Sequence, residues 1–337
     1  MQRTTADPDA WKRLVLQAMK PPAWLDQEGA HREIVLSTRV RHMRNLRGHR
    51  FVHTADAGEL NEIASKVSRA IAQLGDFEVL RHATPAERDY LVACRLVSPD
   101  FPWTAPGRAL ALNASRTMSV MVGEEDHLRI QALTPGWSLG QSSSSAESAL
   151  KGIGDALEFS WTAEYGFLAS SAPNCGDGMR HSAMFHLIGL AHTKRLGTVI
   201  RALGSQGLVV RGLFGERSRA IGAFVQVSTT SRSLPQFVGA CDYLLKEERS
   251  ARKGVPESTP RQKIDETRAA LAGARGTSLA AAMRILAWLR WATSVSESRG
   301  KLHSVDALIP ELALLESLGE DRAGRARLSL LTRVLGP

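Results

Sequence analysis

The stretch Val120-Met-Val-Gly-Glu-Glu-Asp-His-Leu-Arg-Ile130 does most to decide the fold. Apolar residues at both of its ends predict two strands, and the polar middle predicts a tight turn that joins them into a hairpin. The turn crowds five ionisable groups into six positions: Glu124, Glu125, Asp126, His127 and Arg129. Such crowding is typical of a functional site, but a solvated turn also carries charges. This stretch alone leaves both interpretations open.

A second segment, Ser37-Thr38-Arg39-Val40-Arg41, places two arginines two positions apart. On an extended strand, residues at i and i+2 project from the same face. Two guanidinium groups on one face favour an anion as ligand. Taken alone, the segment also fits paired arginines on the surface of an edge strand.

Two further segments read as loops that approach a ligand. Residues 171–180 combine Pro, Asn and Gly and end on Arg180, a composition that permits close backbone approach. Residues 210–218 lead from a strand into a glycine-hinged loop, with Arg211 at its base and Glu216 at its tip. Loops of this kind often close over substrates, and ordinary surface turns have the same composition.

The rest of the chain predicts an α+β fold. Short β-like runs at 33–36, 117–122, 207–210 and 223–227 alternate with helical segments, which indicates a largely antiparallel sheet flanked by helices. An amphipathic pattern predicts an N-terminal helix within residues 1–22 that ends before Pro21-Pro22. We expect a catalytic domain at 23–245, a linker at 246–263 and an all-helical C-terminal domain at 264–337.

Composition narrows the class of protein. The chain of 337 residues is 43% hydrophobic, and 43 Lys+Arg against 34 Asp+Glu give a net charge of +9. This charge suits a nucleic acid, a membrane surface, an acidic protein or a nucleotide, and the predominance of arginine favours phosphate recognition. Three distant cysteines argue against a disulfide framework and predict a cytoplasmic protein. Because no run of about 18 apolar residues is present, we expect no membrane partner.

The four segments, in this order, resemble motifs of the ATP:guanido phosphotransferase family, whose patterns are S-[ST]-R-[VI]-R, N-E-E-D-H-L-R-I, C-P-T-N-x-G-T-x-x-R and R-G-x-x-G-E. The similarity spans about residues 22–245. Trp24-Leu25 is followed within a dozen residues by the first motif, which leaves no room for the small N-terminal domain of phosphagen kinases. The chain therefore most resembles the bacterial protein-arginine kinase (McsB) branch.

The resemblance implies an ATP site, with Mg²⁺ bridging the phosphates and no metal site of the protein's own. By the resemblance, Glu125 and Glu216 grip the acceptor guanidinium, Glu125 acts as base, and Ser171 stands at the position of a reactive cysteine. The nucleotide-binding residues that it implies are Ser37, Thr38, Arg39, Arg41, Arg129, Arg180 and Arg211.

Several positions depart from the family patterns. Ser171 cannot form a thiolate near neutral pH, Gly123 replaces an asparagine, and Arg95 stands where the bacterial proteins tend to have a histidine near the nucleotide. The branch also carries a phosphoarginine-binding R-D-x-x-R-A motif in its C-terminal domain. The nearest stretch here, residues 321–326, has its first two residues in the opposite order.

These features predict a kinase that transfers the γ-phosphoryl group of ATP to arginine side chains exposed on proteins. The resemblance associates such a kinase with an McsA-like activator and a Clp ATPase, and the apolar helix at 279–291 favours a homodimer through the C-terminal helices. Three alternatives stay open: a weakened ATP- or phosphoarginine-binding adaptor, a kinase of small free guanidino compounds, and a nucleic-acid-binding protein. A nucleic-acid binder needs neither Glu125 nor Glu216.

Overall fold

The computed structural model describes residues 21–213, 220–230, 233–296, 302–314 and 319–336. The expected N-terminal helix and the tip of the 210–218 loop, with Glu216, lie outside these residues. No helix in the described ranges is both long and apolar enough to cross a bilayer.

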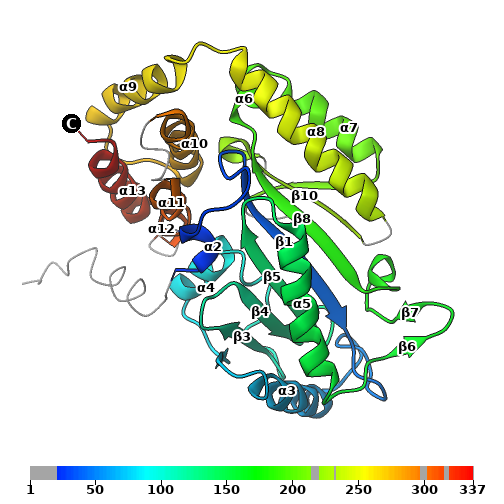
Figure 1. The fold of residues 1–337 in the computed structure, drawn as a ribbon. Helices are drawn as coiled ribbons and strands as arrows, with labels where there is room; N and C mark the ends of the chain where they lie inside the picture. The colour runs from blue at the N-terminus through cyan, green and yellow to red at the C-terminus, as the bar shows by residue number, and fades with distance from the viewer. Residues whose placement is uncertain (1–20, 214–219, 231–232, 297–301, 315–318, 337) are drawn as a thin grey trace, which may run out of the picture.

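The α+β prediction is confirmed, because the centre of the fold is one antiparallel sheet of eight strands in the order β2-β3-β4-β5-β1-β8-β10-β9. A separate two-stranded hairpin, β6-β7, projects from the body beyond the end of β1 (Figure 1). The strands are β1 (Val35–Arg44), β2 (Phe77–Leu80), β3 (Ala109–Asn113), β4 (Met118–Val122), β5 (Leu128–Pro135), β6 (Trp161–Thr162), β7 (Gly166–Phe167), β8 (Met179–His186), β9 (Val209–Gly212) and β10 (Phe224–Thr230).

Helices cover one face of the sheet, and other helices pack against one end of its opposite face. The helices before the C-terminal region are α2 (Ala23–Asp26), α3 (Ala57–Ala72), α4 (Pro85–Ala93), α5 (Leu139–Gly154), α6 (Ile188–His192), α7 (Leu196–Ser205) and α8 (Leu234–Lys253). Val40 of β1 and Ala132 of β5 pack against Ala146 of α5, so this face is a hydrophobic layer. Because side chains alternate along a strand, Arg39 and Arg41 lie on the opposite face.

The C-terminal region is helical, as predicted. It comprises α9 (Thr259–Ala272), α10 (Leu279–Val295), α11 (Leu302–Asp306), α12 (Leu308–Leu314) and α13 (Glu320–Leu335). These helices gather beside α2 and α4 at one end of the sheet (Figure 1). Met283 and Leu286 of α10 share one hydrophobic core with Leu36 and Phe224 of the sheet. The apolar face of α10 is therefore used within its own chain and is no longer an argument for a dimer.

The structure shortens the expected linker. Helix α8 continues to Lys253 and α9 begins at Thr259, so only residues 254–258 separate the two helices. The charged end of α8 remains helical because Glu248 and Arg252, one helical turn apart, are both packed against the body. A charged stretch without apolar periodicity was therefore not sufficient to predict a linker.

Candidate functional site

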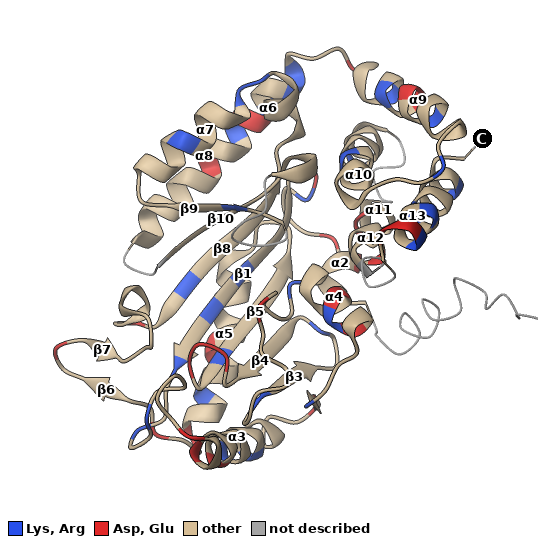
Figure 2. Ribbon diagram, turned by 180° about the vertical axis from the view of Figure 1, so that it is seen from behind, with Lys and Arg blue, Asp and Glu red and all other residues tan. Residues whose placement is uncertain are grey.

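The functional face of the sheet carries arginines from adjacent strands. Arg39 and Arg41 of β1 are almost fully buried although they are charged. Arg41 lies directly opposite Gln131 of β5 on one side and Arg180 of β8 on the other. Cross-strand partners project from the same face, so the register itself assembles these guanidinium groups. Figure 2 shows the basic positions as bands across neighbouring strands, with an acidic turn beside them.

A pocket of about 200 Å³ opens on this face. The sheet supplies its floor, the segment after α4 one wall, and the end of β9 another. Its charged lining consists of Arg39, Arg41, Arg95, Asp100, Glu124, Glu125, Arg129 and Arg211. Four of the five arginines that the motifs predicted therefore lie together with Glu125.

Arg95 and Gln226 complete the arginine cluster, and sequence reasoning did not assign them to it. The Gln226 Oε1 atom accepts hydrogen bonds from Arg39 Nη2 at 3.0 Å and from Arg95 Nη2 at 2.9 Å. Arg95 also donates to the Ser37 hydroxyl. Arg95 has a φ of 62°, a left-handed conformation that turns its side chain from the end of α4 into the pocket. The family resemblance implies a position near the nucleotide for Arg95, and the tertiary fold adds its contacts with Ser37 and Gln226.

Burial and mutual repulsion disfavour the charged form of the arginines on this face. Burial lowers the pKa values of Arg39 and Arg41, and the surrounding arginines lower them further. The pKa of Arg95 falls to about 9, chiefly through burial and secondly through Arg41. The buried Nε atoms of Arg41 and Arg129 have no hydrogen-bond partner among the described residues. Arginines that face one pocket from adjacent strands, with unpartnered donors, fit an anion as ligand.

The acidic turn between β4 and β5 is held in a fixed shape. Gly123 has a φ of 70°, and its N–H donates to the carbonyl oxygen of His127 at 2.9 Å. A Cβ atom there would meet the Gly107 oxygen at 2.8 Å, so glycine fits this turn closely. Asp126 accepts from Asn45 Nδ2 and from the Ser170 N–H, both at 2.7 Å. The replacement of asparagine by Gly123 therefore leaves the turn closed.

Glu124 and Glu125 differ in their surroundings. Glu124 accepts from Arg129 Nη2 at 2.9 Å and from the Ser98 hydroxyl at 2.5 Å, so it orients an arginine of the pocket. Glu125 is exposed at the pocket mouth. Its pKa is raised, first by desolvation and then by Asp126 and Glu124, while Arg129 and Arg180 oppose the rise. A carboxylate whose pKa lies nearer to neutrality is a better proton acceptor at physiological pH.

The loop before β8 is attached to the acidic turn. The Ser170 hydroxyl donates to the backbone oxygen of Glu125 at 2.8 Å, which places Ser171 next to this turn. Ser171 is half-buried. The Cys175 thiol instead contacts the backbone N–H and oxygen of Ala169 at 3.4 and 3.6 Å. Cys175 faces its own loop, so it does not replace the family's cysteine.

One predicted nucleotide residue is placed elsewhere. Thr38 lies on the opposite face of β1, where its hydroxyl donates to the Gly136 oxygen at 2.7 Å and accepts from the Ser138 N–H at 3.1 Å. Thr38 therefore fixes the connection from β5 to α5, and this placement argues against a contact with nucleotide. Ser37 lies beside Arg95, as described above.

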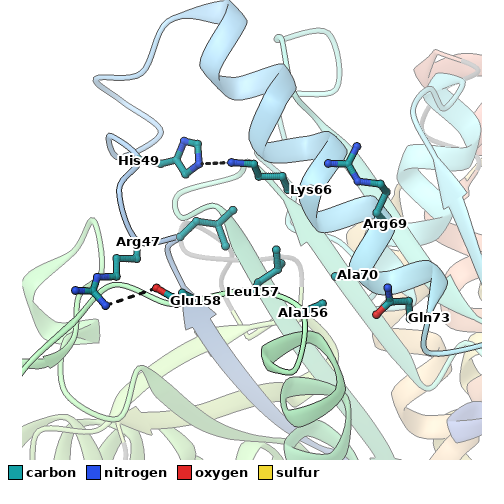
Figure 3. A pocket seen from close by; sticks show the side chains of 10 residues that line it. Arg47, His49, Lys66, Arg69, Ala70, Gln73, Ala156, Leu157 and Glu158 are labelled. Carbon is teal, nitrogen blue, oxygen red and sulfur yellow. Dashed lines mark hydrogen bonds and ion pairs between the residues drawn. The ribbon is translucent and has the colours of Figure 1, made fainter.

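A second hollow, of about 390 Å³, lies between α3 and the segment that follows α5 (Figure 3). Two of its cations already have carboxylate partners: Arg47 pairs with Glu158 at 3.5 Å, and Lys66 pairs with Glu62 at 2.7 Å. No arginine of β1 reaches it. Among the described residues, no group of three or more His, Cys, Asp or Glu side chains is arranged to hold a metal ion. The arginine pocket is thus the candidate active site.

The predicted regulatory stretch lies at the start of α13. Asp321 and Arg325 line a hollow of about 310 Å³ together with Arg275. A cation and a carboxylate at this position are compatible with a charged ligand. The phosphoarginine site that the resemblance implies there stays a prediction.

Comparisons with known proteins identify the class. Residues 59–233 match the family described as ATP:guanido phosphotransferase, C-terminal catalytic domain. This chain belongs to the ATP:guanido phosphotransferase family, and it is a kinase for which ATP is the phosphoryl donor. The family resemblance of the four motifs is thereby confirmed.

Relatives in that family have a more specific name. A protein-arginine kinase of Pelotomaculum thermopropionicum is 34% identical over 79% of this chain and 80% of its own length. A protein-arginine kinase of Moorella thermoacetica is 33% identical over 82% of this chain and 84% of its own length. Among solved structures, a lombricine kinase superposes with a TM-score of 0.58 at 21% identity, over 70% of this chain and 73% of that one. The last likeness concerns the fold alone.

Proposed function

We propose that this protein is a protein-arginine kinase, which transfers the γ-phosphoryl group of Mg·ATP to arginine side chains of other proteins. The observation that carries the proposal is a single pocket in which Arg39, Arg41, Arg95, Arg129 and Arg211 surround an anion-sized space with Glu125 at its mouth. The names of the 33–34% identical relatives support arginine on a protein as the acceptor.

The arginines would act on the phosphate side of the reaction. Phosphoryl transfer spreads negative charge over the equatorial oxygens of the moving group, and positioned cations stabilise that charge. Arg41 and Arg129 offer buried Nε–H donors for this purpose. Arg180, which pairs across the strands with Arg41, would join them. Mg²⁺ would arrive as part of the Mg·ATP substrate.

Glu125 would act on the acceptor side. A guanidinium group has a pKa above about 12, so its nitrogen must lose a proton as it attacks phosphorus. The new N–P bond forms while the bond from the γ-phosphorus to the bridging oxygen of ADP breaks, and the proton passes to the Glu125 carboxylate. The raised pKa of Glu125 suits this role. Glu216 would hold the guanidinium from the other side, and Ser171 would lie beside the acceptor.

The test is transfer of labelled phosphate from Mg·ATP to an unfolded basic protein, with acid treatment to detect a P–N bond. We expect acid-labile label on the protein, a loss of at least about a hundredfold in Glu125→Gln, and little competition from free arginine. Label on free arginine in preference to protein would instead identify a kinase of small guanidino compounds. ATP binding without transfer to either acceptor, even with an added activator protein, would support the adaptor alternative that Ser171 raises.

Further expectations belong to this proposal. We propose a cytoplasmic location, an McsA-like activator and delivery of the modified proteins to a Clp ATPase, all from the family resemblance. A homodimer through the C-terminal helices would use Val295 and Val334, which are exposed and line the same hollow surface. The four-part division of the chain also stays a prediction, with the linker reduced to residues 254–258.

A further inference from the structure

The β6-β7 hairpin exposes two aromatic side chains. Trp161 is 58% exposed and Tyr165 is 55% exposed, both more than Tyr243 of α8 at 43%. Exposing two large aromatic groups on one short hairpin has no benefit for folding. Aromatic residues with an apolar face and a polar edge are enriched where proteins bind other chains.

The base of this hairpin is rigid. The guanidinium carbon of Arg44 lies 3.7 Å from the centre of the Phe167 ring, and the rings of Phe159 and Phe167 meet edge to face at 6.4 Å. The Leu168 N–H also donates to the Ser160 oxygen at 3.0 Å. The tip is therefore presented on a fixed support, which lowers the entropic cost of binding a partner.

The hairpin is continuous with the active site. Phe167 exchanges two backbone hydrogen bonds with Gly176, at 2.8 and 3.1 Å, in the loop that leads to Arg180. Three residues after Phe167, Ser170 is bonded to both Glu125 and Asp126 of the acidic turn. The hairpin and the turn that carries Glu125 are therefore joined through residues 168–170.

The chemistry of the hairpin fits a basic polypeptide. Trp161 pairs across the strands with Phe167, so both rings lie on the face of the hairpin over which Arg44 sits. Glu164 at the tip is exposed and hydrogen-bonds to Tyr165, and Glu158 at the base is 81% exposed and pairs with Arg47. Aromatic faces attract Lys and Arg side chains by cation–π interaction, and the Glu164 carboxylate adds to that attraction.

We propose that the tip of the hairpin, formed by Trp161, Glu164 and Tyr165, is a docking surface for the substrate's own polypeptide: an extended, basic segment that flanks the target arginine. This inference rests on the proposed function, and it describes how the kinase selects its protein substrates. The three residues from Phe167 to Ser170 span at most about 10 Å, and Trp161 lies about 5 Å from its strand partner Phe167. Trp161 is therefore within roughly 15 Å of Ser170. An extended substrate covers that distance with about five residues.

The test compares two acceptors that carry the same arginine. One is an unstructured eleven-residue peptide with a single central arginine and flanking lysines, and the other is acetyl-Gly-Arg-Gly-amide. In the double variant Trp161→Ala, Tyr165→Ala we expect the KM of the long peptide to rise about tenfold. Its kcat, the KM of ATP and the kcat/KM of the tripeptide stay at wild-type values. The matched control is Tyr243→Ala, which removes an exposed aromatic group from α8 and leaves all constants unchanged.

Two results would overturn the docking surface while the proposed function stands. One is an unchanged KM for the long peptide in the double variant. The other is an equal loss with both acceptors, which indicates damage to the active site. If the wild-type chain phosphorylates neither acceptor nor an unfolded basic protein, both the proposed function and the docking surface fail. Circular dichroism of the double variant excludes misfolding, and Glu164→Gln, expected to raise the same KM about threefold, tests the surface without removing a ring.

Discussion

Arg41 shows at the scale of one residue how the site exchanges stability for function. It is buried among Arg39, Arg129, Arg180 and Arg211, and its pKa is lowered by burial and by their charges. Arg41→Met keeps the length of the side chain and removes a repelled charge. We expect the variant to lose about 10²- to 10³-fold in kcat, because a phosphate-facing donor is gone, while its free energy of unfolding rises by about 1 kcal/mol or more. Kinetics and urea unfolding of the same sample measure both effects.

The matched control is Arg44, three positions along the same strand. Its Nη1 atom donates to the backbone oxygens of Met43 at 2.7 Å and Asp177 at 3.0 Å, so its charge has partners. Arg44→Met should lower the free energy of unfolding by roughly 2–3 kcal/mol. If Arg41→Met destabilises the protein as much as Arg44→Met does, the cluster is not a repulsive anion site.

The same scale shows what a sequence can reveal about a site. The i, i+2 spacing of Arg39 and Arg41 was sufficient to place both on one face of a strand. Arg95 and Gln226 were not assigned, because their contact joins the end of α4 to β10 across 131 positions of sequence. Local periodicity contains no information on such a contact. Thr38 was grouped with its neighbours in the motif, although alternation along the strand turns it to the other face.

Helix α8 illustrates the scale of one element. Glu248, fully buried, accepts from the backbone N–H groups of Gly189 at 2.9 Å and Leu190 at 3.0 Å at the start of α6, and it pairs with Arg252 at 2.7 Å. We expect Glu248→Ala to lower the free energy of unfolding by about 3–5 kcal/mol, because two amides and a buried guanidinium lose their acceptor. Urea unfolding followed by circular dichroism provides the measurement.

Glu247, the preceding residue, is the control for this prediction. It pairs with Arg195, whose side chain is 47% exposed, so Glu247→Ala should cost less than about 1 kcal/mol. Equal losses of unfolding free energy in Glu248→Ala and Glu247→Ala would contradict this prediction, because the contacts of Glu248 with α6 would then add no stability.

The buried contacts of Glu248 also explain why the predicted linker began too early in the sequence. The sequence of α8 between 246 and 253 is as charged as a linker, and of its two buried residues, Glu248 and Ala251, one is a charged residue with specific partners.

For the whole molecule, the C-terminal helices belong to the same body as the sheet. Arg290 of α10 donates from Nε to Asp306 at 2.7 Å and from Nη1 to the backbone oxygen of Glu33 at 2.9 Å, just before β1. Arg32 contacts the same carboxylate at 3.2 Å. The helical period of this region was visible in the sequence. Its packing on the sheet was not, since the interface depends on residues more than 250 positions apart.

Four buried histidines are expected to influence how the stability of the whole molecule responds to acid. Burial lowers the pKa values of His42, His127, His181 and His186, that of His42 to about 4. The unfolded chain, with histidine pKa values near 6.5, therefore binds protons that the folded chain does not. We expect stability to be complete above about pH 7.5 and to fall between about pH 6.5 and 4, by up to about 1.4 kcal/mol per pH unit for each histidine.

Two carboxyl groups with raised pKa values, Glu125 and Glu248, act in the opposite direction over part of this range, because their protonation on acidification stabilises the folded state. Four histidines outweigh two carboxyl groups, so the net change is a loss. Urea unfolding at pH 7.5, 6.5, 5.5 and 4.5 measures it. His42→Leu removes one buried titrating ring, and its slope should be smaller than that of the wild type by about the contribution of one proton. An identical slope in both proteins would mean that His42 is as accessible to protons in the folded state as in the unfolded chain.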